Sequence, residues 1–548
     1  MKKFVVIFAA LFVVGNAFDS KACTNFIITK GASTDGSVMV SYSADSHTLY
    51  GELYHYKAAK HQTGAMRRIT DWDSGRPLGS IPEAAETYNV IGNMNEYQVI
   101  IGETTFGGRR ELVDTTGIID YGSLIYIALQ RSKTAREAVQ VMSSLAEKHG
   151  FHSSGETFSI ADKNEAWIME MVGKGPGGKG ALWVARRIPD GYICAHANQA
   201  RIMTFPKNDP ENCLYAKDVI SFARGKGWYN GSDDDFSFSD VYCPIDFHGA
   251  RFCEIRVWSF FKDFSDDMMR YFNYAKGYDM TNRMPLWIKP NKRLSPKDVM
   301  NGMRDHLEGT ELDMRQDLGA GPHGLPYRWR PLTWKVDGHE YCNERATATQ
   351  QTGFWFVGQA RSWLPDVIGG IFWFGVDDAA TSALTPMYSS MTKTPHVFAV
   401  GNGSMSEYSE TSSFWLFNRV ANFTYLRYDV MAADVCKAMH ELEDGYLKDV
   451  ARADAEAQSL YKSNPQKAQQ YLTDYSNKQA DATFQRWKKL DQYLLLKYVD
   501  GNIKKEKDGK FVPNKYNTTV ASPDQPGYPE SWLKIIVEDT GDKLKVVE

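Results

Sequence analysis

Cys23 lies where an apolar leader gives way to a run of strand-forming residues, and its thiol is the first candidate for chemistry. The leader combines Lys2 and Lys3 with an apolar run over residues 4–14, followed by small and polar residues, which is typical of a secretory signal. Cleavage after Ala22 would make Cys23 the first residue of the mature chain. Its α-amine, with a pKa of about 7.7, could then act as general base for the thiol of the same residue, which would be the nucleophile.

Other interpretations of Cys23 stay open at this point. The residue could be half of a disulfide in an exported protein. A lipid-modified cysteine is disfavoured because Ser20 stands three residues before it, where an apolar residue is expected. The leader could also end at Ala17, which would leave residues 18–22 as a short propeptide to be removed later.

Acyl transfer to a thiol also needs groups that hold the amine, donate to the developing oxyanion and tune the thiol. Asp45 ends the second strand of an opening hairpin, which would return it close to the amine of Cys23. Asn198 follows a later strand and is a candidate oxyanion donor. Arg251 and Arg256 are five residues apart, so in a strand they would point to opposite faces and at most one would face the site.

Competing chemistries have less support in the sequence. It contains no GxSxG elbow, HExxH helix or P-loop, and its seven cysteines form neither a CxxC framework nor a zinc pattern, so we expect no metal and no cofactor. His47 and His196 are candidates to assist the thiol, although a lone histidine is more often structural. With Cys23 reserved for chemistry, the pairing of the other six cysteines stays open.

Composition restricts the partners and the location of the protein. The chain has 548 residues, a formal net charge of −4, 43% hydrophobic and 24% charged residues, as in a globular protein with a sizeable core. Such weak acidity gives no reason to expect nucleic acid or an anionic membrane as partner. After the leader no apolar run is long enough to span a bilayer, so we expect an exported protein, periplasmic or secreted. A homo-oligomer is compatible with this composition.

The elements that must position these residues alternate between strands and helices. Strand patterns cover residues 24–56 and 88–105, and helical patterns begin at Ser123 and at the capping box Thr134-Ala135-Arg136-Glu137. Strands return over residues 158–196, residues 280–361 are left unassigned, and residues 406–498 are strongly helical with a break at Asn464-Pro465. This order favours helices packed on stacked antiparallel sheets over a doubly wound parallel sheet.

Several segments together carry a resemblance to a known family. The chain resembles the cysteine dipeptidases among the N-terminal nucleophile hydrolases, a family that includes dipeptidase A and the secernins and is related to bile salt hydrolases and penicillin V acylases. The segments that carry the likeness, in chain order, are Cys23-Thr24-Asn25-Phe26, Ala32-Ser33-Thr34-Asp35-Gly36-Ser37, Asp45, Asn95-Glu96, Gly102-Glu103-Thr104-Thr105, Ala197-Asn198-Gln199-Ala200-Arg201, Trp373-Phe374-Gly375 and Pro386.

The resemblance implies an α+β fold, an αββα sandwich of antiparallel sheets with a helical C-terminal region. It also implies a Cys23 nucleophile, no metal, and hydrolysis of dipeptides or short peptides. Asp45 would hold the amine, Asn198 the oxyanion, and Arg251 or Arg256 would tune the thiol. The sequence departs from the related hydrolases at Tyr42, where they often carry an arginine.

We therefore expect a signal peptide over residues 1–22, a hydrolase domain over 23–400, and a mainly helical region over 401–548 packed on or completing that domain. The function expected is that of an exported cysteine dipeptidase. One alternative is a hydrolase of non-peptide amides, such as a bile salt or acyl-amide hydrolase, because these present the same bond. Another is an exported binding protein in which Cys23 is structural.

Overall fold

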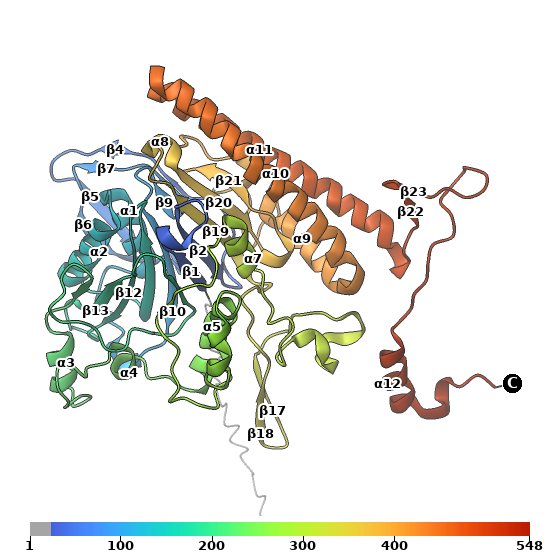
Figure 1. Cartoon of the computed structure of the whole chain (residues 1–548), viewed down its shortest axis with the longest axis horizontal. Coiled ribbons are helices and arrows are strands. Elements are labelled where there is room, and N and C mark those ends of the chain that lie inside the picture. The colour runs from blue at the N-terminus through green and yellow to red at the C-terminus, as the bar shows by residue number, and fades with distance from the viewer. Residues whose placement is uncertain (1–22, 548) are drawn as a thin grey trace, which may run out of the picture.

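The opening hairpin forms the centre of the first of two large sheets in the computed structural model, which describes residues 23–547 (Figure 1). The predicted leader lies outside the described residues. β1 (Thr24–Ile28) pairs with β2 (Val38–Asp45) on one side and with β14 (Ile193–His196) on the other, all antiparallel. The sheet has the order β16-β14-β1-β2-β19-β20-β21, with β16 at Trp287–Ile288, β19 at Thr352–Ala360, β20 at Gly370–Val376 and β21 at Thr385–Tyr388.

The second sheet is also antiparallel, and within the strand pattern of residues 88–105 it contains a hairpin of β9 (Met94–Asn95) and β10 (Ile100–Phe106). Of the strand pattern that follows β2 within residues 24–56, only β3 (His55–Tyr56) forms a strand. The order is β15-β13-β12-β11-β10-β9-β8-β3; the other strands are β8 (Val90–Ile91), β9 (Met94–Asn95), β10 (Ile100–Phe106), β11 (Gly155–Ala161), β12 (Ala166–Gly173), β13 (Ala181–Arg187) and β15 (Cys213–Tyr215).

Alternation along the strands divides the core into layers. Ile27 belongs to a cluster shared by both sheets, whereas its neighbours Phe26 and Ile28 pack on the opposite face of β1. On that face lie α5 (Ile255–Lys262), α7 (Pro296–Gly302) and parts of the C-terminal helices. The outer face of the second sheet is covered by α1 (Tyr121–Arg131) and α2 (Ala135–His149) (Figure 1). The expected mixture of helices and stacked antiparallel sheets is confirmed.

The helical C-terminal region is also confirmed and packs on the first sheet beside β21 (Figure 1). α9 (Ser413–Leu426) is followed by α10 (Tyr428–Ser463) and α11 (Pro465–Tyr498), so the chain breaks where Asn464-Pro465 predicts. The side chain of Asn464 accepts hydrogen bonds from the backbone of Gln466 and Lys467, and proline is favoured at the first helical position. Val450 of α10 and Leu472 of α11 join the core on the outer face of the first sheet.

The remaining elements are short. They are β4 (Ala59–Lys60), β5 (Met66–Thr70), β6 (Pro77–Pro82), β7 (Glu86–Thr87), α3 (Val219–Gly225), α4 (Phe238–Tyr242), α6 (Phe272–Ala275), β17 (Thr333–Val336), β18 (His339–Cys342), α8 (Asp366–Gly369), β22 (Glu506–Lys507), β23 (Lys510–Phe511) and α12 (Glu530–Thr540). α12 buries none of its side chains and lies away from the body in Figure 1.

The segment carrying Arg251 and Arg256 differs from the strand considered above. Residues Gly249–Glu254 form one wide helical turn that continues into α5. Ile255, Trp258 and Phe261 are buried at a spacing of three, close to the helical period of 3.6 residues, and they pack toward the first sheet. The segment is therefore a helix and not a strand, and the two arginines lie on one helical segment.

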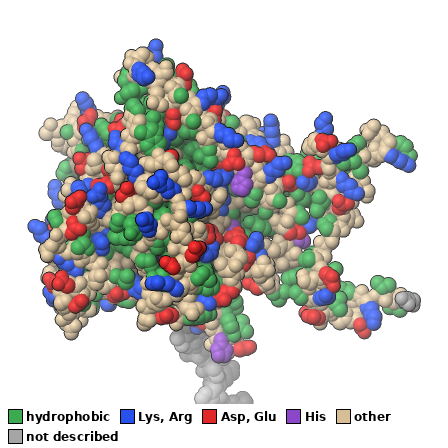
Figure 2. Space-filling model, in the orientation of Figure 1, with side chains coloured by type: hydrophobic (Ala, Val, Ile, Leu, Met, Phe, Trp, Pro, Cys, Tyr) green, Lys and Arg blue, Asp and Glu red, His purple; other side chains and the backbone are tan. Residues whose placement is uncertain are grey.

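On the face drawn in Figure 2, acidic and basic side chains are interspersed. None of the helices within residues 23–547 is long and apolar enough to cross a membrane. All seven cysteines fall within these residues and all are free thiols, so Cys23 is not half of a disulfide here.

Candidate functional site

Cys23 directly precedes β1 and is held from two sides. Its side chain is 5% exposed, and its backbone N–H donates to Oδ1 of Asn198 at 3.0 Å. Asn198 follows β14, the neighbour of β1, and has a φ of 64°, a left-handed conformation that asparagine tolerates better than most residues. The sheet register therefore brings Cys23 and Asn198 together although 175 residues separate them.

Arg256 ties the two residues to the rest of the site. Its guanidinium is fully buried and donates from Nη1 to the carbonyl of Cys23 at 2.7 Å and to Thr24 Oγ1 at 2.8 Å. Nη2 donates to Asn198 Oδ1 and to the carbonyl of Ala197, each at 3.0 Å. Of the two candidate arginines, Arg256 is thus the one at the site.

Arg251 points elsewhere on the same helical segment. Its guanidinium forms a two-pronged ion pair with Glu344 and donates to the carbonyl of Lys276. Among the described residues no hydrogen bond is found between Arg251 and Cys23, Asp45 or Asn198.

Asp45 lies at the site, but its carboxylate has other partners than the nitrogen of Cys23. Oδ2 pairs with Arg345 at 3.0 Å, and Oδ1 accepts from Thr352 Oγ1 at 2.7 Å. The backbone N–H of Asp45 is what interacts with the Cys23 sulfur. Among the described residues the nitrogen of Cys23 therefore donates to Asn198. Asp45 was predicted to hold this nitrogen.

Arg345 supplies a positive charge near the site that is missing at Tyr42, where related hydrolases often have an arginine. It comes from the segment left unassigned in the sequence, is 4% exposed, and reaches Asp45 across 300 residues. With Arg256 it places two cations next to the start of β1. No motif marks Arg345 in the sequence, and only the fold could have revealed it.

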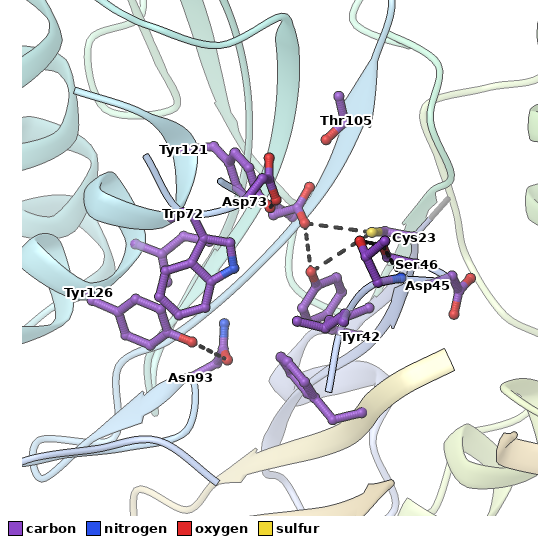
Figure 3. A pocket seen from close by; sticks show the side chains of 17 residues that line it. Cys23, Tyr42, Asp45, Ser46, Trp72, Asp73, Asn93, Thr105, Tyr121 and Tyr126 are labelled. Atoms are coloured by element: carbon purple, nitrogen blue, oxygen red, sulfur yellow. Dashed lines mark hydrogen bonds between the residues drawn. The ribbon is translucent and has the colours of Figure 1, made fainter. Parts of the chain in front are cut away.

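Tyr42 and Glu103 lie against the thiol and were missed as site residues. The Cys23 sulfur is 3.8 Å from Tyr42 Oη and 3.6 Å from Glu103 Oε1, and Tyr42 Oη donates to Glu103 Oε1 at 2.6 Å (Figure 3). The sheets approach closely here because Gly102 has no side chain; a Cβ there would lie 3.3 Å from Tyr42 Cβ and overlap the side chain of Asn25.

The surroundings keep the thiol neutral in this form of the chain. Burial raises the pKa of Cys23 well above its usual value, and the negative charges of Glu103 and Asp45 add to the effect. Burial and the neighbouring Arg345 lower the pKa of Arg256 to about 9. A thiol in such a setting needs a base to take its proton.

Neither histidine is placed to be that base. The ring nitrogens of His196 are hydrogen-bonded to Thr104 Oγ1 and Ser159 Oγ, each at 2.7 Å, and burial lowers its pKa well below the usual value. His47 lies in the exposed turn after β2. His196 therefore has the structural role that is commoner for a lone histidine.

The thiol opens onto a cavity between the end of β2, β10 and α1. Its empty volume is about 660 Å³, part of it open to solvent. Aromatic and acidic side chains form its walls, among them Trp72, Asp73, Glu103, Tyr121 and Tyr126 (Figure 3). Across residues 23–547 no group of three or more His, Cys, Asp and Glu side chains is arranged to hold a metal ion.

Comparison with known proteins identifies the family of the chain. The sequence model of Peptidase family C69 matches residues 22–441, a span that begins next to Cys23 and includes both sheets. The chain belongs to peptidase family C69.

Curated members similar to this C69 chain are distant in sequence but align over most of their length. A probable dipeptidase of Salmonella dublin is 25% identical over 71% of this chain and 86% of its own. A probable dipeptidase B of Streptococcus pyogenes serotype M1 is 22% identical over 87% and 93%. Dipeptidase A of Lactobacillus helveticus is 23% identical over 77% and 84%.

Proposed function

We propose that this C69 protein is an exported cysteine dipeptidase whose nucleophile is the thiol of Cys23, freed at the N-terminus by removal of residues 1–22. The observation that carries the proposal is the position of Cys23, whose sulfur borders the cavity while its nitrogen is fixed by Asn198 Oδ1. The names of the C69 relatives supply the substrate class. The layered sheets and helices would then be the αββα sandwich of the N-terminal nucleophile hydrolases.

Acylation begins with proton transfer within one residue. The α-amine of the freed Cys23 takes the thiol proton, and the thiolate attacks the carbonyl carbon of the peptide bond to give a tetrahedral oxyanion. Collapse of this intermediate breaks the C–N bond, and the ammonium returns its proton to the leaving amine. The new positive charge beside the sulfur also opposes the effect of Glu103, which holds the thiol pKa high.

Deacylation uses the same groups in reverse order. The amine removes a proton from water, the resulting hydroxide attacks the thioester, and the C–S bond breaks to restore the thiol. Arg256 donates to the carbonyl of Cys23 and to Asn198, so it keeps the nucleophile and the candidate oxyanion donor in fixed relation.

Asn198 can be tested by separating its two atoms. Asn198→Asp keeps Oδ1, which accepts from Cys23 and Arg256, but removes Nδ2, which now donates to the carbonyl of Thr105 at 2.6 Å. If Nδ2 also stabilises the oxyanion, kcat on dipeptides should fall by about 10²–10³-fold with a smaller change in KM. If Asn198→Asp leaves kcat unchanged, the oxyanion donor lies elsewhere, and Thr104 and Thr105 are the next candidates.

Processing gives the decisive test of the proposal. A chain that retains Ala22 has an amide instead of an amine at Cys23, so it should lose about 10²–10⁴-fold in kcat, the contribution of a general base. We would compare it with the chain that starts at Cys23, after mass spectrometry has verified both N-termini and circular dichroism their folding. Equal turnover of the two chains would exclude an N-terminal nucleophile.

A further inference from the structure

The cavity beside Cys23 has a concentration of negative charge on one wall. Glu103 and Asp73 both line it, and Asp73 Oδ1 accepts a hydrogen bond from Tyr121 Oη at 2.8 Å. In Figure 3 Asp73 and Tyr121 lie next to each other across the cavity from Cys23. Trp72 and Tyr126 also line the cavity.

Glu103 shares its burial with a second carboxyl group, Glu156, and both are 1% exposed. Glu156 Oε1 accepts from Thr105 Oγ1 at 2.9 Å, and Glu103 Oε1 accepts from Tyr42 at 2.6 Å. Burial raises the pKa of both groups, and for Glu156 the charge of Glu103 raises it further, well above the usual value. Two carboxyl groups this close in a buried site favour sharing one proton and one negative charge.

The negative charge of Glu103 and Glu156 has no counter-ion among the described residues. The two carboxyl groups interact with each other, and no other described residue donates a hydrogen bond to Oε2 of either group. A buried carboxylate is costly unless a cation or several donors compensate it. No arginine or lysine within residues 23–547 makes an ion pair with Glu103 or Glu156. A cation from outside the chain fits this position.

We propose that the wall formed by Glu103, Asp73 and Tyr121 binds the α-ammonium group of the substrate, so that the enzyme requires a free N-terminus on the residue whose carbonyl Cys23 attacks. This inference rests on the proposed function and adds its recognition element. In an amino acid the ammonium nitrogen is only about 2.5 Å from the carbonyl carbon, two bonds away. A group that binds it must therefore lie beside the nucleophile, and Glu103 Oε1 is 3.6 Å from the Cys23 sulfur.

The same geometry separates peptides from other amides. A bile acid or an acyl chain would put carbon against the charge of Glu103 and leave that charge unpaired, which is unfavourable. An ammonium would instead pair with the charge of Glu103. Because that charge raises the pKa of the Cys23 thiol, the pairing would lower this pKa again. We therefore expect the ammonium to improve kcat as well as KM.

Two substrates that differ only in this group provide the test. Alanyl-phenylalanine carries the ammonium, and propionyl-phenylalanine replaces it with hydrogen at the same position. For the unmodified enzyme we expect kcat/KM to be about 10- to 100-fold lower for propionyl-phenylalanine, the loss typical of one charge-assisted hydrogen bond. Acetyl-alanyl-phenylalanine, which also lacks the ammonium and is larger, should be cleaved no better than the propionyl compound.

Two variants assign the preference to the charge on Glu103. Glu103→Gln removes it from the cavity wall while keeping an acceptor for Tyr42, so the preference for the ammonium should shrink to about threefold or less. Glu156→Gln is the matched control, because it still donates to Glu103 and leaves the charge in place; its preference should stay near that of the unmodified enzyme. Loss of the preference in Glu156→Gln alone would overturn the assignment to Glu103.

The outcomes distinguish this inference from the proposed function. Equal cleavage of alanyl- and propionyl-phenylalanine by the unmodified enzyme would overturn the ammonium site and leave a Cys23 peptidase standing. If a preparation whose N-terminus is verified as Cys23 cleaves neither substrate, the proposed function is overturned, and the ammonium site with it. Because the comparison of the two substrates uses the unmodified enzyme, it tests the ammonium site even if Glu103→Gln fails to fold.

Discussion

Cys23→Ser is expected to lower kcat on dipeptides by about 10³-fold or more while the protein remains folded. The substitution keeps a nucleophilic atom and the α-amine, but a hydroxyl ionises far less readily than a thiol and is a weaker nucleophile. Burial and the charge of Glu103 already disfavour an anion at this position, and this penalty falls more heavily on an alkoxide. Steady-state kinetics on a set of dipeptides would measure the loss.

Cys436→Ser is the matched control for the nucleophile. Cys436 is a free, partly buried thiol in α10, outside the cavity, so its replacement should change kcat by less than about twofold. Near-normal turnover by Cys23→Ser, with alkylation of the remaining thiols shown to be harmless, would make Cys23 structural and the assignment of this site wrong.

Arg256→Met is expected to affect both stability and activity. The variant leaves buried acceptors without a donor, including the carbonyls of Cys23 and Ala197, and the free energy of unfolding should fall by about 3 kcal/mol or more. Because the same guanidinium fixes Asn198 Oδ1, kcat should fall as well, and Arg256→Lys should restore little since one ammonium cannot reach all these oxygens.

Arg251→Met provides the comparison on the same helical segment. It breaks the ion pair with Glu344, which costs stability, but it removes no contact to Cys23 or Asn198, so kcat of the folded fraction should be kept. Urea denaturation and kinetics on both variants would separate the two effects. A loss of kcat in Arg251→Met as large as in Arg256→Met would contradict the assignment of Arg256 to the site.

The sequence predicts well those parts of the site that depend on local order. A cysteine before a strand, a turn, and a returning strand determine β1 and β2, and Asn198 follows the strand that pairs with β1. The proline at 465 and the asparagine before it determine where α10 gives way to α11. These features are encoded by neighbouring residues, and short-range chemistry is enough to find them.

Residues that reach the site through distant pairing were not predictable in this way. Arg345 meets Asp45 because β19 returns next to β2, a register that the sequence does not display. Glu103 belongs to a motif that was recognised, yet its contact with Cys23 depends on how closely the two sheets approach at Gly102. The helix holding Arg256 was missed because a short run with two arginines suits a strand or a helix equally well.

The free state of all seven cysteines also bears on how the enzyme can be kept active and repaired. Under the proposed export and thiol mechanism, Cys23 would meet oxidants that convert a cysteine to sulfenic acid or a mixed disulfide, both reversible by small thiols. Here no crosslink holds the fold together, so dithiothreitol has nothing structural to cut. We therefore expect the protein to keep its fold in strong reductant, and an oxidised Cys23 to be regenerated without refolding.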